Sequence, residues 1–94
     1  MMTRIIKPGF FRNESMSELP VMTKLLYVGL WCMADKESRL EDNPQQIKTT
    51  VFPFDDCDVD ALLDDLQGAG LILRIEAKNG RIIQFCANRK EMLS

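Results

Sequence analysis

Carboxylate side chains dominate the middle of this sequence. Between positions 55 and 65 the chain has six aspartates and no basic residue. Adjacent carboxylates such as Asp55 and Asp56 can act as a general acid and a general base, but they need a cleft that holds a substrate. So small a domain hardly provides one, and the sequence has no histidine, no nucleophile motif and no glycine-rich phosphate loop. We therefore expect a protein that is not an enzyme.

The same acids resemble the start of a calcium loop, because Asp56, Asp58 and Asp60 alternate like the first ligands of an EF-hand. The match fails at the two defining positions, where Ala61 replaces the glycine and Gln67 replaces the glutamate. The three cysteines are widely spaced and form no CxxC pair, as is typical of reduced thiols in a cytosolic protein. We expect neither a bound metal nor another cofactor.

The basic residues flank the acidic block. The chain of 94 residues has a net charge of −2, which by itself favours neither nucleic acid nor a membrane surface as a partner. Six of its twelve cations lie in two segments, near the N-terminus and after the acidic block. They are Arg4, Lys7 and Arg12 in the first segment, and Arg74, Lys78 and Arg81 in the second. No apolar run is long enough for a signal peptide or a membrane span, so we expect a cytoplasmic location.

Apolar periodicity predicts three helices. The first begins at Pro20, and we expect it to be broadly buried around a stripe with helical spacing. The residues of that stripe are Val21, Leu25, Val28 and Cys32, flanked by Met22, Leu26, Leu30, Trp31 and Met33. Gly29 lies inside this helix and weakens it, which indicates close packing against a neighbouring element.

Capping residues mark the other two helices. Asn43 is the predicted N-cap of the second helix, with Pro44 in its first turn, and Phe52-Pro53 ends it. Asp58 is the predicted N-cap of the third helix, and Gly68 or Gly70 ends it. The buried face of the third helix is expected to consist of Val59, Leu62, Leu63 and Leu66. A short extended segment around Leu40 precedes the second helix.

Two β-rich runs surround Asn79-Gly80, which is the strongest short signal for a β-hairpin. The predicted order is therefore helix, short strand, helix, helix, hairpin. This order predicts an α+β fold of the winged helix-turn-helix class, with the hairpin as the wing. We expect an extended basic arm over residues 1–19, a winged-helix domain over 20–88 and a C-terminal tail over 89–94.

The motifs "LLYVGLW", "SRLEDNP" and "FPFDD" resemble the N-terminal winged-helix domain of phage and prophage replication-initiation proteins of the replisome-organiser type. The resemblance covers about residues 7 to 85 and implies a DNA-binding role in replication initiation or its regulation. Two departures stand out. The family often has glycine at the position of Ser38, and its members usually continue into a linker and a second domain, whereas this chain stops at Ser94.

The third helix does not suit DNA. Its apolar face leaves Asp60, Asp64 and Asp65 toward solvent, on the face that enters the major groove in an ordinary helix-turn-helix. DNA carries about one negative charge per 1.7 Å of axis, so these carboxylates are repelled. Acids near the start of the helix are favoured by its dipole, but Asp64 and Asp65 lie in its last turn. They are either solvated or paired with a basic partner.

Three other parts of the chain have side chains suited to contacts with DNA. The expected DNA contacts are Arg74, Lys78, Asn79 and Arg81 in the wing, Arg4, Lys7 and Arg12 in the arm, and Gln46, Lys48 and Thr49 on the second helix. Each set is also compatible with an ordinary solvated surface. So few phosphate contacts predict weak, salt-sensitive binding by one copy, and hence self-association when DNA is bound.

Phe10 and Phe11 are adjacent aromatics in the expected arm. Neighbouring residues of an extended strand point in opposite directions, so one of the two is expected at an intersubunit contact. Trp31 is expected in the core. Two functions remain open: a DNA-binding winged helix, or a protein-interaction module whose acidic third helix docks on a basic partner or mimics DNA. Charge on the arm and wing favours the first function, and charge on the third helix favours the second.

Overall fold

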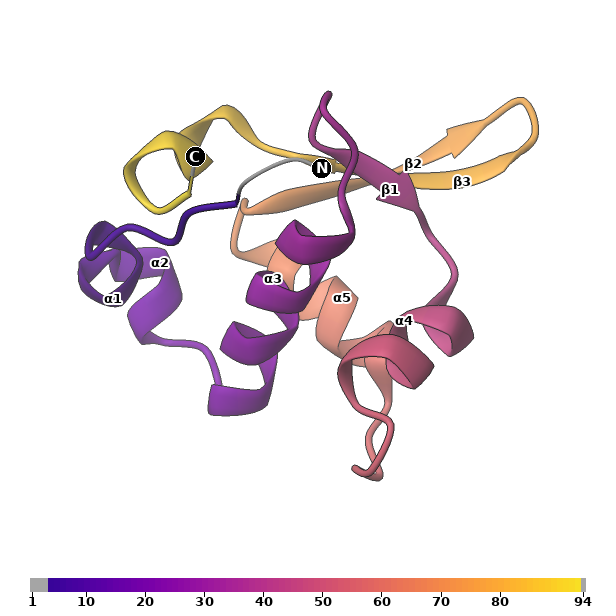
Figure 1. Ribbon diagram of the computed structural model, residues 1–94, viewed down its shortest axis with the longest axis horizontal. Helices are drawn as coiled ribbons and strands as arrows, with labels where there is room; N and C mark the ends of the chain where they lie inside the picture. The colour runs from indigo at the N-terminus through magenta and orange to yellow at the C-terminus, as the bar shows by residue number, and fades with distance from the viewer. Residues whose placement is uncertain (1–3, 94) are drawn as a thin grey trace.

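Three longer helices pack on one side of a three-stranded antiparallel sheet in the computed structural model, which describes residues 4–93 (Figure 1). The helices are α1 (Gly9–Arg12), α2 (Glu14–Ser17), α3 (Val21–Met33), α4 (Pro44–Val51) and α5 (Val59–Gly68), followed near the C-terminus by the 3-10 helix η1 (Ala87–Glu91). The strands are β1 (Arg39–Glu41), β2 (Ile72–Ala77) and β3 (Gly80–Phe85). The fold is therefore of the α+β class. Within residues 4–93, no helix has both the length and the apolarity needed to cross a bilayer.

The sheet has the order β1-β3-β2. The predicted short strand around Leu40 is β1, and Leu40 lies opposite Ile83 of β3. The predicted hairpin is formed by β2 and β3, with Ala77 opposite Gly80. Gly80 has φ +130°, a conformation that residues with a side chain rarely adopt. Both predictions are confirmed.

The predicted helix starts are confirmed. The Asn43 side chain accepts a hydrogen bond from the backbone N–H of Gln46 at 3.1 Å, and Pro44 occupies the first turn of α4. The Asp58 side chain accepts one from the backbone N–H of Ala61 at 3.2 Å at the start of α5. After α5 the chain turns into β2 through Gly70, which has φ +76°.

The face of α3 that is buried differs from the predicted one. Val21 is 77% exposed, Leu25 is 51% exposed and Cys32 is also exposed. The core side of α3 instead consists of Thr23, Leu26, Tyr27, Leu30 and Trp31. The reason is that α3 is apolar almost all round, so its periodicity does not select one face. Gly29 does pack closely as predicted: a Cβ atom built there would lie 2.5 Å from Cγ2 of Val51 in α4.

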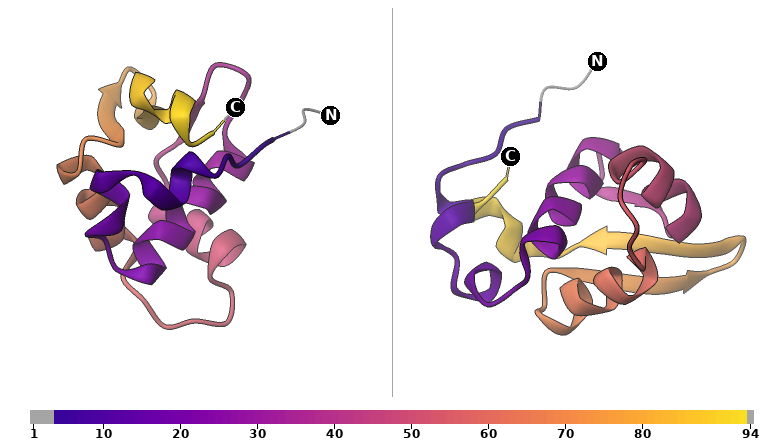
Figure 2. Two further views of the ribbon diagram at one scale, coloured as in Figure 1. Left: turned by 90° about the vertical axis from the view of Figure 1, so that its left-hand side faces the viewer. Right: turned by 90° about the horizontal axis from the view of Figure 1, so that it is seen from below.

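The expected extended arm is wrong, because residues 9–17 form the short helices α1 and α2. Phe10 and Met16 of these helices are buried, as are Met92 and Leu93 at the other end of the chain. Ile6 and Leu93 form a β-bridge, so the two terminal segments lie together (Figure 2). The core therefore extends beyond the predicted domain of residues 20–88 into both flanking segments. Residues 1–3 and 94 of the predicted arm and tail lie outside the described range.

Candidate functional site

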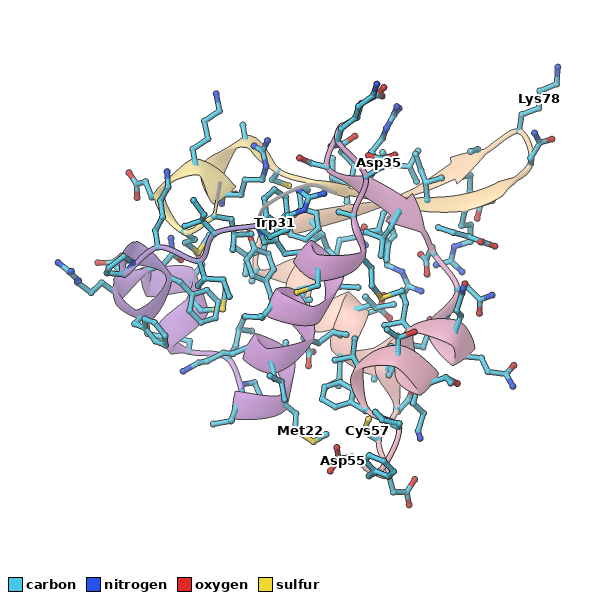
Figure 3. The ribbon with its side chains drawn as sticks, viewed as in Figure 1. Met22, Trp31, Asp35, Asp55, Cys57 and Lys78 are labelled. Carbon is cyan, nitrogen blue, oxygen red and sulfur yellow. The ribbon has the colours of Figure 1, made fainter. Side chains whose placement is uncertain are left out.

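The β2–β3 hairpin extends past α4 and α5 to one side of the molecule (Figures 1 and 2). Its tip consists of Lys78, Asn79 and Gly80, and all three are exposed. The side chain of Lys78 points away from the body of the protein (Figure 3). Beside the tip, a shallow hollow of about 400 Å³ is lined by residues that include Glu41, Lys78 and Arg81.

The base of the hairpin is held by an ion cluster around Arg74. Its guanidinium donates from Nε to Oδ2 of Asp42 at 2.7 Å and from Nη2 to Oδ1 of Asp42 at 3.0 Å. It also donates to Oδ1 of Asp60 at 2.7 Å and to Oδ1 of Asp64 at 2.8 Å. The side chains of Arg74 and Asp42 are 3% and 0% exposed. We call Asp42, Asp60, Asp64 and Arg74 the Arg74 cluster.

The cluster joins three parts of the fold. Asp42 follows β1, Arg74 belongs to β2, and Asp60 and Asp64 lie on successive turns of α5. A further bond fixes the same strand, since the backbone N–H of Arg74 donates to Oε1 of Gln67 at 2.7 Å. The hairpin therefore leaves the body of the protein from a base that is fixed on both sides.

The cluster also shifts two pKa values. The hydrogen bonds to Asp42 raise the pKa of Arg74 above its ordinary value, against the opposing effect of burial. The hydrogen bond from Arg74 lowers the pKa of Asp60 below its ordinary value. Both shifts favour the charged forms of Arg74 and Asp60.

Three expected site residues are therefore engaged within the chain. Arg74, expected to contact DNA, is buried and surrounded by carboxylates, which leaves it no donor for a phosphate. Asp60 and Asp64, expected to meet a basic partner, are paired with Arg74, although their side chains are 58% and 64% exposed. Asp65 is exposed. Arg81 remains 45% exposed and lies 3.5 Å from Asp42.

The cations of the expected arm are separated from the hairpin. Arg4 donates to the backbone carbonyls of Ala34 and Asp35 at the end of α3, and its guanidinium lies 4.2 Å from the ring centroid of Trp31. Lys7 donates to the carbonyl of Lys90 at 2.8 Å. Arg4 is thus a structural residue rather than an open DNA contact. Arg12 is exposed on α1, which lies at the opposite end of the molecule from the hairpin tip (Figures 1 and 2).

Helix α4 lies on the same side of the molecule as the hairpin (Figure 1). Gln46 and Thr49 on this helix are exposed, and Lys48 is half-buried. The hydroxyl of Thr49 donates to the carbonyl of Gln45 at 3.0 Å, so its oxygen lone pairs are left for outside donors. The structure thus places the expected contacts of α4 on the same side as the hairpin and Arg12 at the far end (Figure 1), while Arg4 is bound at the end of α3.

The two adjacent phenylalanines differ in exposure, but they lie on helix α1 rather than on an extended strand, and the intersubunit contact expected for one of them stays a prediction. Phe10 is 5% exposed and Phe11 is 77% exposed, with ring centroids 5.1 Å apart. Trp31 is buried in the core as predicted (Figure 3). Within residues 4–93, no group of three Cys, Asp or Glu side chains is arranged to hold a metal ion.

No protein-family model matches the chain, and searches of curated proteins and of solved structures likewise found no match.

Proposed function

We propose that this chain is a winged-helix DNA-binding module, with β2–β3 as its wing. The order helix, strand, helix, helix, hairpin and the sheet order β1-β3-β2 support this interpretation. The short helices α1 and α2 are additions ahead of α3. The resemblance of the sequence motifs to phage and prophage replication-initiation proteins favours a role in replication initiation or its regulation, in the cytoplasm.

The observation that carries this proposal is the projecting hairpin with a fixed base and a basic tip. The Arg74 cluster holds the base against α5, so the tip is presented in one orientation. At the tip, Lys78 supplies a cation and Asn79 an amide for base edges or phosphates. A two-stranded hairpin tip is slim enough for a minor groove.

Helix α4 supplies the second part of the proposed surface. Lys48 is suited to a phosphate, and Gln46 and Thr49 offer neutral donors and acceptors. Helix α5 does not enter a groove in this proposal, because Asp60 and Asp64 are bound to Arg74 and the exposed Asp65 would face the phosphates. The proposed surface therefore differs from that of an ordinary helix-turn-helix, in which the last helix reads the bases.

The small number of cations limits the affinity of one copy. We assume that Lys48, Lys78 and Arg81 each neutralise one phosphate. A plot of the logarithm of the binding constant against the logarithm of the salt concentration should then have a slope of about −2.7. Two copies on one duplex would double this electrostatic contribution, so the proposal includes self-association on DNA.

Fluorescence anisotropy tests the proposal, with the whole chain titrated onto labelled duplex DNA at two salt concentrations. The double variant Lys78→Ala/Arg81→Ala should bind more weakly, and its salt slope should be smaller by about 1.8. Arg12→Ala is the matched control, because it removes a cation from the far end, and it should bind like the unaltered protein.

Three results would contradict the proposal. They are the absence of duplex binding at low salt, an equal loss in the control and the double variant, and tighter binding to single-stranded DNA than to duplex. The last result would exclude a groove as the binding site.

A further inference from the structure

The connection between α4 and α5 presents a phenylalanine to solvent. Phe54 is 95% exposed, whereas Phe52, two residues earlier, is 0% exposed. Single exposed apolar residues are common, but an aromatic ring with this degree of exposure is a large apolar surface for water to cover. Phe54 contributes nothing to the core, so the core does not explain it.

A fixed turn holds Phe54 outward. The backbone N–H of Phe52 donates to the carbonyl of Lys48 at 2.8 Å, and the buried Phe52 ring anchors the start of the turn. The backbone N–H of Asp55 donates back to the carbonyl of Phe52 at 3.4 Å, which closes a turn with Pro53 at its second position. Proline restricts φ to the value that this position requires. The ring of Phe54 is therefore presented by an ordered backbone, as a binding anchor needs.

The charged residues that directly follow Phe54 in the sequence are all acidic. Asp55, Asp56 and Asp58 follow it and are exposed, and the chain has no Lys or Arg between Lys48 and Arg74. Unlike Asp60 and Asp64, whose carboxylates are bound to Arg74, these three acids lie outside the Arg74 cluster.

The same end of the molecule has further exposed apolar surface. Val21, at the start of α3, is 77% exposed. The start of α3 and the α4–α5 connection both lie at the lower side of the molecule in Figure 1, and Met22, Asp55 and Cys57 are labelled there in Figure 3. The exposed ring of Phe54 and the carboxylates that follow it thus lie at the same end of the molecule as the start of α3 (Figure 1).

We propose that the Phe52–Asp58 turn is a docking element for a partner protein whose surface is apolar at its centre and rimmed by Lys or Arg. The ring of Phe54 would be buried in the apolar centre, and Asp55 and Asp56 would meet the basic rim. Charge complementarity selects this class of partner, because phosphates of nucleic acid and of anionic lipid are repelled by the same carboxylates.

The turn follows directly after α4, the second part of the proposed DNA surface, but it lies away from the hairpin tip. The turn projects at the bottom of Figure 1, and the hairpin tip projects at the upper right. The docking proposal rests on Phe54, Asp55 and Asp56, none of which belongs to the proposed DNA surface, so it does not depend on DNA binding.

The experiment uses a fluorescent 14-residue helical peptide of Lys and Leu, whose leucines form one face and whose lysines border it. Its matched control replaces every Lys with Glu. Anisotropy should show that the whole chain binds the Lys peptide and not the Glu peptide. Phe54→Ala should weaken binding at least fivefold, and Asp55→Asn/Asp56→Asn should weaken it and reduce its salt dependence.

Phe11→Ala is the matched protein control, since it removes another exposed ring from α1, away from the turn (Figure 1), and should leave peptide binding unchanged. Lys78→Ala should also leave it unchanged, which separates this proposal from the DNA proposal. Thermal unfolding should show equal stability for Phe54→Ala and the unaltered chain, so that any loss of binding is not a loss of folding.

Several outcomes would overturn the proposal. They include no binding of the Lys peptide, equal binding of both peptides, and equal effects of Phe54→Ala and Phe11→Ala. Sedimentation supplies the last one: if Phe54→Ala converts a dimer into a monomer, the occupant of the turn is a second copy of this chain rather than a basic partner.

Discussion

The guanidinium of Arg74 and the carboxylate of Asp42 form a two-point ion pair inside the protein, with distances of 2.7 and 3.0 Å. The two residues are 32 positions apart in sequence, and neither side chain is more than 3% exposed. This pair fixes the hairpin to the segment that precedes α4. It explains why a cation that was expected to meet DNA is instead part of the scaffold.

Removing one partner of this pair should be severely destabilising. Arg74→Ala removes the two-point partner of the buried Asp42 carboxylate and leaves it Arg81 at 3.5 Å, so we expect a loss of about 3 kcal/mol in the free energy of unfolding, the lower end of the usual range. Urea denaturation followed by circular dichroism measures the loss. The double variant Arg74→Met/Asp42→Leu should recover most of the lost stability, because it removes both charges. A single variant as stable as the unaltered chain would show that the pair is not formed in solution.

Asp60 should contribute to the loss of folding stability at low pH. Its pKa is lowered in the folded protein by the hydrogen bond from Arg74, so its stabilising effect is present above the ordinary value of 3.8. That effect is lost as the pH falls through the lower, folded-state pKa. Asp60→Asn should therefore lower stability at pH 7 and flatten its decline below pH 3.8. Asp65→Asn removes a charge from the same helix outside the cluster, and a similar flattening in that control would contradict the assignment.

Tyr27 should contribute to the loss of folding stability at high pH. Burial, the largest cause, raises its pKa above the ordinary value of 10.0, so its contribution to stability is present below pH 10.0 and is lost as the pH rises further. Its hydroxyl is buried with no hydrogen-bond partner within residues 4–93. Tyr27→Phe should therefore leave stability at pH 7 unchanged or increased, and reduce the loss above pH 10.0. Melting temperatures across this pH range test both expectations, and a marked loss at pH 7 would indicate a partner for the hydroxyl.

Gly29 should not tolerate a methyl group. Alanine is favoured over glycine in helices by about 1 kcal/mol, yet the added Cβ would lie 2.5 Å from Cγ2 of Val51. We expect overpacking to prevail, so Gly29→Ala should destabilise the protein by about 1–3 kcal/mol. The pair Gly29→Ala/Val51→Ala should be more stable than Gly29→Ala alone, if the collision is the cause. Chemical denaturation of these two variants and of the unaltered chain gives the sign of each change in the free energy of unfolding.

Local features of the fold were predictable from the sequence because their causes lie within a few residues. The caps at Asn43 and Asp58 depend on one side chain and a backbone N–H three positions later. The hairpin depends on Asn79-Gly80 and the two β-rich runs beside it. Ser38 has φ +62°, a left-handed conformation in which glycine is less strained than serine.

The tertiary structure alone decided which residues are open to a partner. The sequence determined that α3 would be apolar and that cations would gather on the hairpin, but not that Val21 and Leu25 would face solvent or that Arg74 would be enclosed by acids. It also contained no signal that Asp42 would meet Arg74, because that contact requires the pairing of β1, β3 and β2. Helical periodicity and charge are properties of single segments. Burial and ion pairing depend on the register and packing of segments far apart in the chain, and these are set only when the core forms.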